Sequence, residues 1–444
     1  MRPDHPRRRN PVPDLVPSRP ARLSGAPSAG VPRSRGRLTT KPEPIADGRR
    51  RIARVSHIPA VDGLRALAVL AVIAYHFGLP LHGGFLGVDL FFVISGYVIT
   101  RLLLAERART GTTRLAVFWG RRARRLFPAV LAVLVAVQVW MHLGAGTPMR
   151  HTVNSQTLAA LVYGSNWYSI FAEVGYWGMP VDRAPLNHLW SLAVEEQYYL
   201  VWPLVFVVLM GTVGSRRVLA CAALLCAGCA YTAMHLLFLP GAPDRAYLGT
   251  DCRAGGLALG ALLAVLSTSP AVVDRRLPAR VTAPAGVLAG ACLACLWSTA
   301  NLNDRGLYTW QLAVAGAAAA TLIGSLVLTP EGLPARVMGS RPLVAVGKVS
   351  YSLYLWHWPI WVFLAAERPQ WPATERVVVA AIATAVVATA SYHVVENPLR
   401  HSHRPMRALA PAFLAVAAMV ACAALLLQPP APVEQRDDVQ VSGP

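Results

Sequence analysis

Residues 61–76 read VDGLRALAVLAVIAYH and form the first stretch of the chain that is long and apolar enough to cross a bilayer. Arg65 and His76 stand eleven positions apart within it. In a helix this spacing brings both residues to one face, about 16 Å apart along the axis. A charge at bilayer depth costs roughly 2.5 to 3.5 kcal/mol and is usually kept only where it faces a bundle interior or a polar cavity. We therefore expect a helix bundle with a polar interior. The alternative is an arginine that extends to the membrane interface and a histidine satisfied between helices.

The composition of the whole chain excludes an ordinary water-soluble protein. Hydrophobic residues make up 55% of the 444 residues, charged residues make up 14%, and the mean hydropathy is +0.43. The net charge of +20 does not predict a nucleic-acid partner, because the basic residues gather at the ends of apolar segments. Residues 1–55 hold fourteen Lys and Arg against four acids, so 14 − 4 = +10 comes from this part. Its Pro, Ser, Gly and Arg content predicts a disordered cytoplasmic tail, with anionic membrane lipid as an expected partner.

Hydropathy predicts an all-α, polytopic bundle of about eleven membrane-spanning helices. A further segment, 153–171, is doubtful because polar residues interrupt it. If 147–186 is an outer loop, the most basic loops all face the cytoplasm, as the positive-inside rule requires. We therefore expect the N-terminus inside, the C-terminus outside, and the doubtful segment re-entrant or on the outer surface. The expected spans are 61–81, 85–105, 126–146, 187–211, 217–239, 248–267, 283–300, 309–328, 343–366, 377–396 and 407–428.

Several acids and histidines fall at comparable depths in these spans. His76, Glu195, Glu196 and His357 are all expected in the outer half of the bundle, and Asp89 begins near the outer rim. Such a group is typical of a general acid/base site. A structural ion-pair network is the alternative. Glu195 and Glu196 point about 100° apart, so at most one of them can face His76 directly.

A basic cluster marks the opposite side of the membrane. Residues 118–128 read FWGRRARRLFP and place Arg121, Arg122, Arg124 and Arg125 in two overlapping Arg-x-x-Arg pairs. Guanidinium groups on consecutive turns suit phosphates, because each guanidinium group can bind a phosphate through two hydrogen bonds. Anchoring on anionic lipid explains the same charges. The seven cysteines, including two Cys-x-x-Cys pairs, have no local partners for a metal site, so we expect neither a metal ion nor a disulfide.

Six motifs in order resemble the membrane-bound acyltransferase-3 family. They are DGLR at 62–65 with His76, GFLGVDLFFVISGY at 84–97, RRARRLFP at 121–128, HLWSLAVEEQYY at 188–199, SYSLYLWH at 350–357 and ENP at 396–398. The resemblance implies a membrane domain of ten helices over 56–400, followed by an additional helix at 401–428 and a short extracytoplasmic tail at 429–444. It also implies transfer of an acyl group, commonly acetyl from cytoplasmic acyl-coenzyme A, to a hydroxyl of a glycan, glycolipid or glycosylated metabolite in a bacterial plasma membrane.

The resemblance also implies roles for individual residues. Arg65 and His76 match the family's essential Arg-x10-His pair, and Glu195 or Glu196 would orient or charge-balance His76. Residues 121–125 would dock the coenzyme A phosphates. His76 would take the proton of the acceptor hydroxyl or promote passage through a covalent intermediate. We expect substrate contacts at Asp89, Tyr351, Trp356 and His357. Packing at the bilayer interface explains the presence of the aromatic residues about as well.

Many relatives carry an extracytoplasmic SGNH-type domain after an eleventh helix, and only about sixteen residues follow that helix here. Transfer would then finish within the bundle or through a separate extracytoplasmic partner. A polytopic transporter or flippase is the alternative function, since it too needs buried charge. The order of the motifs shows no inverted repeat of the kind that transporters use.

Overall fold

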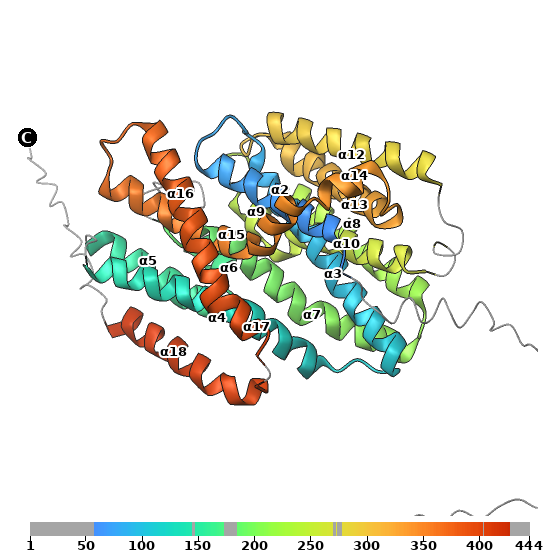
Figure 1. Ribbon diagram of the computed structural model, residues 1–444, viewed down its shortest axis with the longest axis horizontal. Helices are drawn as coiled ribbons and strands as arrows, with labels where there is room; N and C mark the ends of the chain where they lie inside the picture. The colour runs from blue at the N-terminus through green and yellow to red at the C-terminus, as the bar shows by residue number, and fades with distance from the viewer. Residues whose placement is uncertain are drawn as a thin grey trace, which may run out of the picture. The chain divides into compact units, whose positions relative to one another are not determined.

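The computed structural model describes residues 57–143, 147–172, 184–269, 272, 278–402 and 404–426. These residues form helices and no named strand (Figure 1), which confirms the predicted all-α class. The main helices are α2 (Pro59–His76), α3 (Gly87–Thr110), α4 (Leu115–Leu143), α5 (Thr147–Leu161), α6 (Ser165–Phe171), α7 (Trp190–Thr212), α8 (Arg216–Leu237), α9 (Asp244–Leu248), α10 (Thr250–Ser267), α12 (Ala279–Thr299), α13 (Leu312–Leu328), α14 (Leu333–Met338), α15 (Arg341–Glu367), α16 (Ala373–Ser391), α17 (Asn397–Arg400) and α18 (Met406–Leu426).

Ten helices in the described part of the chain are long and apolar enough to cross a membrane. They fall on ten of the eleven expected spans. The remaining expected span, 343–366, lies in α15, which is 27 residues long but less apolar, since its middle carries serine, tyrosine, histidine and tryptophan side chains. A helix of that length reaches about 40 Å, which exceeds the apolar thickness of a bilayer. The predicted tails at 1–55 and 429–444 lie outside the described residues.

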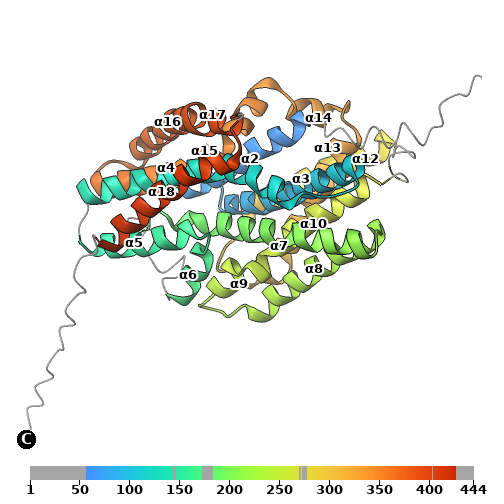
Figure 2. The same ribbon diagram turned by 90° about the horizontal axis from the view of Figure 1, so that it is seen from below.

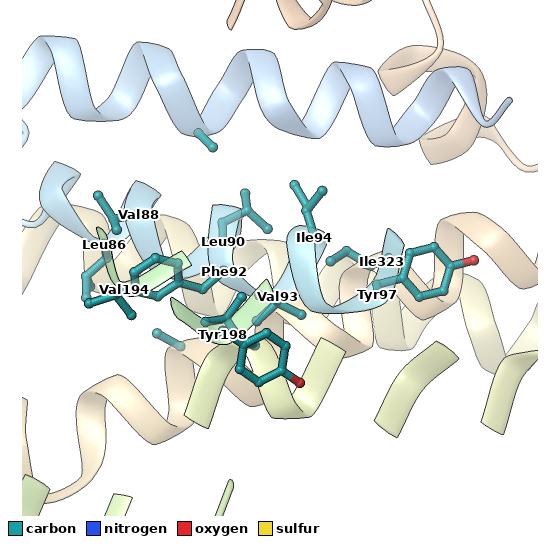
Figure 3. Close-up of a cluster of buried hydrophobic side chains, with 14 of the residues drawn as sticks. Leu86, Val88, Leu90, Phe92, Val93, Ile94, Tyr97, Val194, Tyr198 and Ile323 are labelled. Carbon is teal, nitrogen blue, oxygen red and sulfur yellow. The ribbon is translucent and has the colours of Figure 1, made fainter. Parts of the chain in front are cut away.

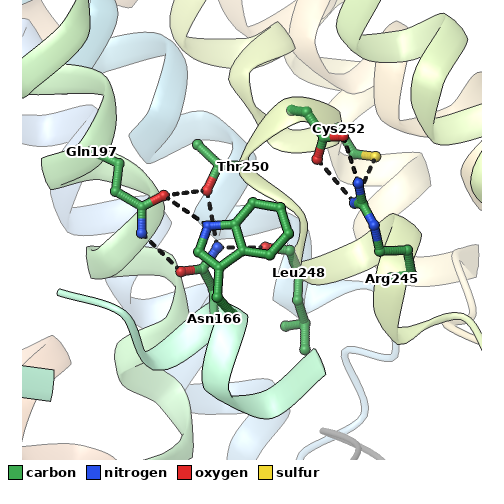
Figure 4. A network of polar contacts seen from close by, with 8 residues as sticks. Asn166, Gln197, Arg245, Leu248, Thr250 and Cys252 are labelled. Atoms are coloured by element: carbon green, nitrogen blue, oxygen red, sulfur yellow. Dashed lines mark hydrogen bonds and ion pairs between the residues drawn. The ribbon is translucent and has the colours of Figure 1, made fainter. Parts of the chain in front are cut away.

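The doubtful segment forms two short helices. The 15-residue α5 and the 7-residue α6 are separated by Tyr163, whose φ of 53° breaks the helix. Each is shorter than the roughly 20 residues that a span needs. A polar network fixes α6 to the bundle (Figure 4): Asn166 donates to the Leu248 carbonyl and to Thr250 Oγ1, and Gln197 Nε2 donates to Asn166 Oδ1 at 3.0 Å. The segment is therefore an ordered part of the fold and contains no single helix of spanning length.

Helix α3 supplies much of the main apolar core. Figure 3 shows its side chains Leu90, Phe92 and Ile94 packed beside Val194 of α7 and Ile323 of α13. It also packs closely against α10. A Cβ at Gly96 would lie 1.8 Å from the Leu257 carbonyl oxygen of α10, so only glycine allows this approach. Small residues at such contacts are a common device of membrane helices.

The α3–α10 contact predicts a stability defect. Gly96→Ala should lower the free energy of unfolding by about 1 to 3 kcal/mol, because the helices must separate to admit the methyl group. Thermal unfolding of the detergent-solubilised protein measures this. Gly290→Ala in α12 is the matched control, since a Cβ there meets nothing within 4 Å. Equal unfolding temperatures for both variants would contradict the close packing.

The pairing of α2 with α15 positions the functional residues (Figure 1, Figure 2). It too depends on a glycine, because a Cβ at Gly347 would lie 1.9 Å from the Asp62 carbonyl oxygen. Side chains of α2 therefore face those of α15 along the length of the contact. Arg65 lies near one end of this pair and His76 near the other.

Candidate active site

Three histidines from different parts of the sequence meet at one end of the bundle. His76 Nδ1 lies 2.8 Å from His357 Nε2, and the two rings stack at 5.0 Å with an interplanar angle of 16°. His188, just before α7, lies with its ring centre 5.6 Å from that of His357. His188 and His357 are almost fully buried. We call these three residues the histidine cluster.

Hydrogen bonds to carbonyl groups fix the protonation pattern of this cluster. His357 Nδ1 lies 2.6 Å from the Tyr354 carbonyl oxygen, which can only accept, so Nδ1 must carry the proton. In a neutral His357 the other nitrogen, Nε2, is then an acceptor, and His76 Nδ1 donates to it. This leaves Nε2 of His76 as the nitrogen that carries the basic lone pair. His357 thus positions His76, as a third group orients the base in other catalytic sites.

His188 is held in a similar way. Its Nε2 lies 3.2 Å from the Leu355 carbonyl oxygen and donates to it, so its Nδ1 is an acceptor. That atom has no hydrogen-bond partner among the described residues. His188 begins the motif at 188–199, and nothing in the order of residue types predicts a role for it. Its position became evident only when α7 and α15 were placed together.

A cavity of about 350 Å³, here the central cavity, lies among α2, α3, α7 and α15. Among the residues predicted for a site, Arg65, Glu195 and Tyr351 line it. Ser191 and Tyr354 line it as well. On α3 its wall runs from Val88 to Leu102, which corresponds to about 21 Å of helix. The cavity is therefore long and narrow.

Tyr354 and Ser191 form the boundary between this cavity and the histidine cluster. The two hydroxyl oxygens lie 2.5 Å apart, and Tyr354 Oη also donates to the His188 carbonyl at 2.8 Å. The Tyr354 carbonyl, in turn, accepts the hydrogen bond from His357. One tyrosine thus contacts the cavity with its side chain and the histidine cluster with its backbone.

A second cavity of about 530 Å³, the arginine cavity, adjoins the first at the opposite end. Leu102, Arg122, Arg125 and Arg400 line both. Arg124, besides lining the second cavity, donates to the Ser402 and Arg404 carbonyls and so fixes the segment before α18. Apart from Glu106, the charged residues that line the arginine cavity are Arg109, Arg121, Arg122, Arg124, Arg125 and Arg400.

A buried acid lies close to this positive end. Glu396 ends a π-helical turn after α16, is 1% exposed, and accepts a hydrogen bond from Ser352 Oγ. Its carboxylate interacts electrostatically with Arg125, Arg65 and Arg400. Arg65 therefore belongs to the arginine end of the site, whereas His76, eleven residues along the same helix, belongs to the other end.

Glu195 and Glu196 lie where we did not expect them. Glu196 pairs with Arg122 at 3.7 Å, and Glu195 accepts hydrogen bonds from Ser95 and Tyr199. Glu195 follows His188 by seven residues, which is about 10 Å of helix. The geometry therefore corrects the prediction that either glutamate orients His76: Glu195 lines the central cavity, Glu196 pairs with Arg122, and His357 has the orienting position.

Asp89 and Trp356 also lie apart from the cavity walls. Asp89 is 5% exposed, and both of its oxygens accept from Arg253 Nη2 at 3.0 Å. The Arg253 guanidinium is enclosed by the rings of Phe92, Trp190 and Tyr247. Asp89 is thus half of a buried ion pair between α3 and α10, and not a residue that lines the cavity. Trp356 packs in the apolar cluster formed with α4 and α5.

The described residues contain no group of three or more His, Cys, Asp or Glu side chains arranged to hold a metal ion. The histidine cluster illustrates why. Two of its nitrogens, His357 Nδ1 and His188 Nε2, are directed at carbonyl groups, and a third accepts from His76. The first two therefore carry protons, and the third is already a hydrogen-bond acceptor, so these nitrogens do not bind one metal ion together.

Residues 58–426 match the family model described as an acyltransferase domain. The chain belongs to this acyltransferase family. It is 37% identical over 351 residues to the putative peptidoglycan O-acetyltransferase YrhL of Bacillus subtilis, 36% identical over 349 residues to the O-acetyltransferase OatA of Staphylococcus aureus, and 35% identical over 357 residues to the peptidoglycan O-acetyltransferase OatA of Listeria monocytogenes. Each match covers 78% of this chain and between 55% and 57% of the relative. No solved structure is significantly similar to the chain.

The histidine cluster and the residues named in both cavities lie within one family match. The family match extends through α18, so it includes every site residue named above. Three residues to which the sequence gave no role, His188, Ser191 and Tyr199, all lie inside the motif at 188–199. Their residue types alone did not distinguish them from packing residues.

Proposed function

We propose that this acyltransferase moves an acyl group, acetyl in particular, from acyl-coenzyme A to a hydroxyl of a cell-wall glycan. The observation that carries the proposal is the pair of adjoining cavities, which extends from a wall of arginines to the Tyr354–Ser191 pair beside the histidine cluster. The relatives are named as O-acetyltransferases, two of them as peptidoglycan O-acetyltransferases, and these names support the glycan acceptor and the acetyl group.

The arginine cavity suits the phosphates of the donor. Guanidinium groups bind phosphate oxygens through two parallel hydrogen bonds, and six of them share this wall. The pantetheine arm of coenzyme A has about the chain length of four amino-acid residues, so it extends about 14 Å. The central cavity, about 21 Å long on α3, can hold the arm and bring the thioester to Tyr354 and Ser191.

The histidine cluster suits the chemistry of transfer. His76 Nε2 takes the proton of the acceptor hydroxyl while that oxygen attacks the thioester carbonyl carbon. The carbon–sulfur bond then breaks, and the coenzyme A thiolate leaves with the proton that His76 had taken. During this exchange His357 Nε2 accepts the hydrogen bond from the His76 imidazolium and stabilises its charge. The Tyr354 side chain must move aside for the thioester to reach His76.

We place the arginine cavity on the cytoplasmic side, where acyl-coenzyme A is made. The N-terminus is then inside, the C-terminus outside, and the histidine cluster in the outer half of the membrane, next to the glycan. The charge asymmetry of the loops supports this orientation.

Cysteine labelling tests the orientation. In a variant without the seven native cysteines, Asn303→Cys, in an exposed loop after α12, should react with an impermeant maleimide on intact cells. Arg280→Cys, exposed at the start of α12, should react only after permeabilisation. The reverse pattern would contradict the proposed sidedness.

Expression in a bacterium whose peptidoglycan is not O-acetylated tests the function. Base-labile acetate on isolated glycan should rise when the chain is present and stay at background with the His76→Asn variant. Unchanged glycan together with acetate on another envelope polymer would replace peptidoglycan as the acceptor. No new ester on any envelope component would contradict the proposed function.

A further inference from the structure

Glu195 is the one carboxylate deep in the described wall of the central cavity. The other acid that lines it, Asp62, lies near its edge and is hydrogen-bonded to the exposed His57. Five arginines also line this cavity, yet the described ion pairs do not include Glu195. Arg122, for example, pairs with Glu196. Arg122 also interacts electrostatically with Glu195, but at longer range than its ion pair with Glu196. Among the described residues, Glu195 therefore has no ion pair of its own.

The hydrogen bonds of Glu195 leave one oxygen with unused capacity. Oε1 accepts from both Ser95 Oγ and Tyr199 Oη, which fixes the carboxylate between α3 and α7. Oε2 accepts no hydrogen bond from any described residue. A carboxylate away from bulk water is stabilised by every donor it receives. Its second oxygen is thus available to a donor in the cavity.

A second polar atom without a partner lies on a different wall of the same cavity. Ser350 on α15 is 0% exposed, and its hydroxyl has no hydrogen-bond partner among the described residues. Ser350 precedes Tyr354 by four residues, and Glu195 follows Ser191 by four. Since Tyr354 and Ser191 are hydrogen-bonded to each other, both groups lie about 6 Å of helix below that pair, at one level.

An acceptor on one wall and a hydroxyl on another match the two sides of a trans amide. The N–H and C=O of such an amide point in opposite directions. The pantetheine arm contains two amides, and one of them lies a few ångström from the sulfur. With the thioester at the Tyr354–Ser191 pair, that amide falls at the level of Glu195 and Ser350.

We propose that Glu195 and Ser350 recognise an amide of the pantetheine arm. Glu195 Oε2 accepts the hydrogen bond of the amide N–H, and Ser350 Oγ donates to the amide carbonyl. This proposal rests on the proposed function, and it makes Glu195 a donor-binding residue. The arginine cavity then binds the phosphates, and Glu195 and Ser350 bind the pantetheine arm.

Steady-state kinetics with three acetyl donors tests the proposal: acetyl-coenzyme A, acetyl-pantetheine, and S-acetyl-2-mercaptoethanol, which has no amide. In Glu195→Gln the hydroxyls of Ser95 and Tyr199 hold the amide oxygen, so the new NH₂ group meets the N–H of the arm. We expect the KM of the first two donors to rise about tenfold to a hundredfold with kcat nearly unchanged. The amide-free donor should react as it does with the wild type.

Ser350→Ala tests the carbonyl half and should raise the same two KM values about twofold to tenfold. Glu331→Gln, on an exposed loop after α13, is the matched control and should change none. A fall in kcat of Glu195→Gln that is equal for all three donors would overturn the proposal, because it indicates a role in chemistry or folding. If Glu195→Gln does not accumulate, equal effects of Ser350→Ala on all donors overturn it instead. A wild type that consumes none of the donors refutes the proposed function itself, and this proposal with it.

Discussion

His76→Asn should lower acyl transfer by about 10² to 10⁴-fold while the protein accumulates normally. Asparagine can still donate a hydrogen bond to His357 Nε2, and it is not much smaller than histidine, but it cannot take a proton near neutral pH. The variant therefore keeps the packing of the histidine cluster and loses only the base. Turnover per molecule of purified protein is the quantity to measure.

The matched control is His82→Asn, a histidine exposed in the loop after α2. It should retain wild-type turnover. A structural role for His76 predicts the opposite pattern, with reduced accumulation and near-normal activity per molecule. Retention of more than about a tenth of wild-type turnover by His76→Asn is too small an effect for a catalytic base and would refute the assignment.

Replacing Arg122 and Arg125 together by alanine should raise the KM for acetyl-coenzyme A by about 10²-fold or more. Each guanidinium that binds a phosphate contributes about 1.5 to 3 kcal/mol. Acetyl-pantetheine, which lacks the phosphates, should be affected far less. Because Arg122 also pairs with Glu196, the unfolding temperature of the variant must be measured alongside the kinetics.

Arg336→Ala combined with Arg341→Ala is the control for this pair, since both residues are exposed and line neither cavity. It should leave the KM unchanged. Unchanged kinetics of the Arg122/Arg125 variant, together with misoriented insertion, would instead favour a lipid anchor at this cluster.

The bundle itself was predictable because apolar length is a local property of the sequence. The expected spans lie on the observed long helices, and the polar residues in 153–171 fall in a segment that forms two short helices. The shared face of Arg65 and His76 also followed from helix periodicity. The sequence could not show that Arg65 and His76 lie in two separate surroundings, because the neighbouring helices form the arginine end and the histidine end.

The depth of Glu195 and Glu196 was wrong for a physical reason. We counted the depth of His76 from the inner end of its helix and the depth of the two glutamates from the outer end of theirs. In the structure α2 ends at His76, and Gly78 adopts a φ of 71° directly afterwards. His76 therefore lies at the end of its helix, whereas Glu195 lies well inside α7. Depths counted from opposite ends of two different helices can differ by several ångström, which is enough to exchange one neighbour for another.

The sequence also could not predict which groups donate and which accept in the hydrogen bonds of the site. The assignment of His357 as the residue that positions His76 depends on which carbonyl its Nδ1 meets, here that of Tyr354. The ion pair of Asp89 with Arg253 depends on the packing of α3 against α10. Both relations join residues that are close in space through helix geometry and carry no signature in the order of residue types.

The most direct test of the account uses purified protein in liposomes, supplied with acetyl-coenzyme A labelled in the acetyl group and with peptidoglycan glycan strands. We predict release of the coenzyme A thiol together with label in a base-labile ester on the glycan, and neither product with His76→Asn. Intact acetyl-coenzyme A, with glycan or its precursor carried across the bilayer, would contradict the account and identify a transporter.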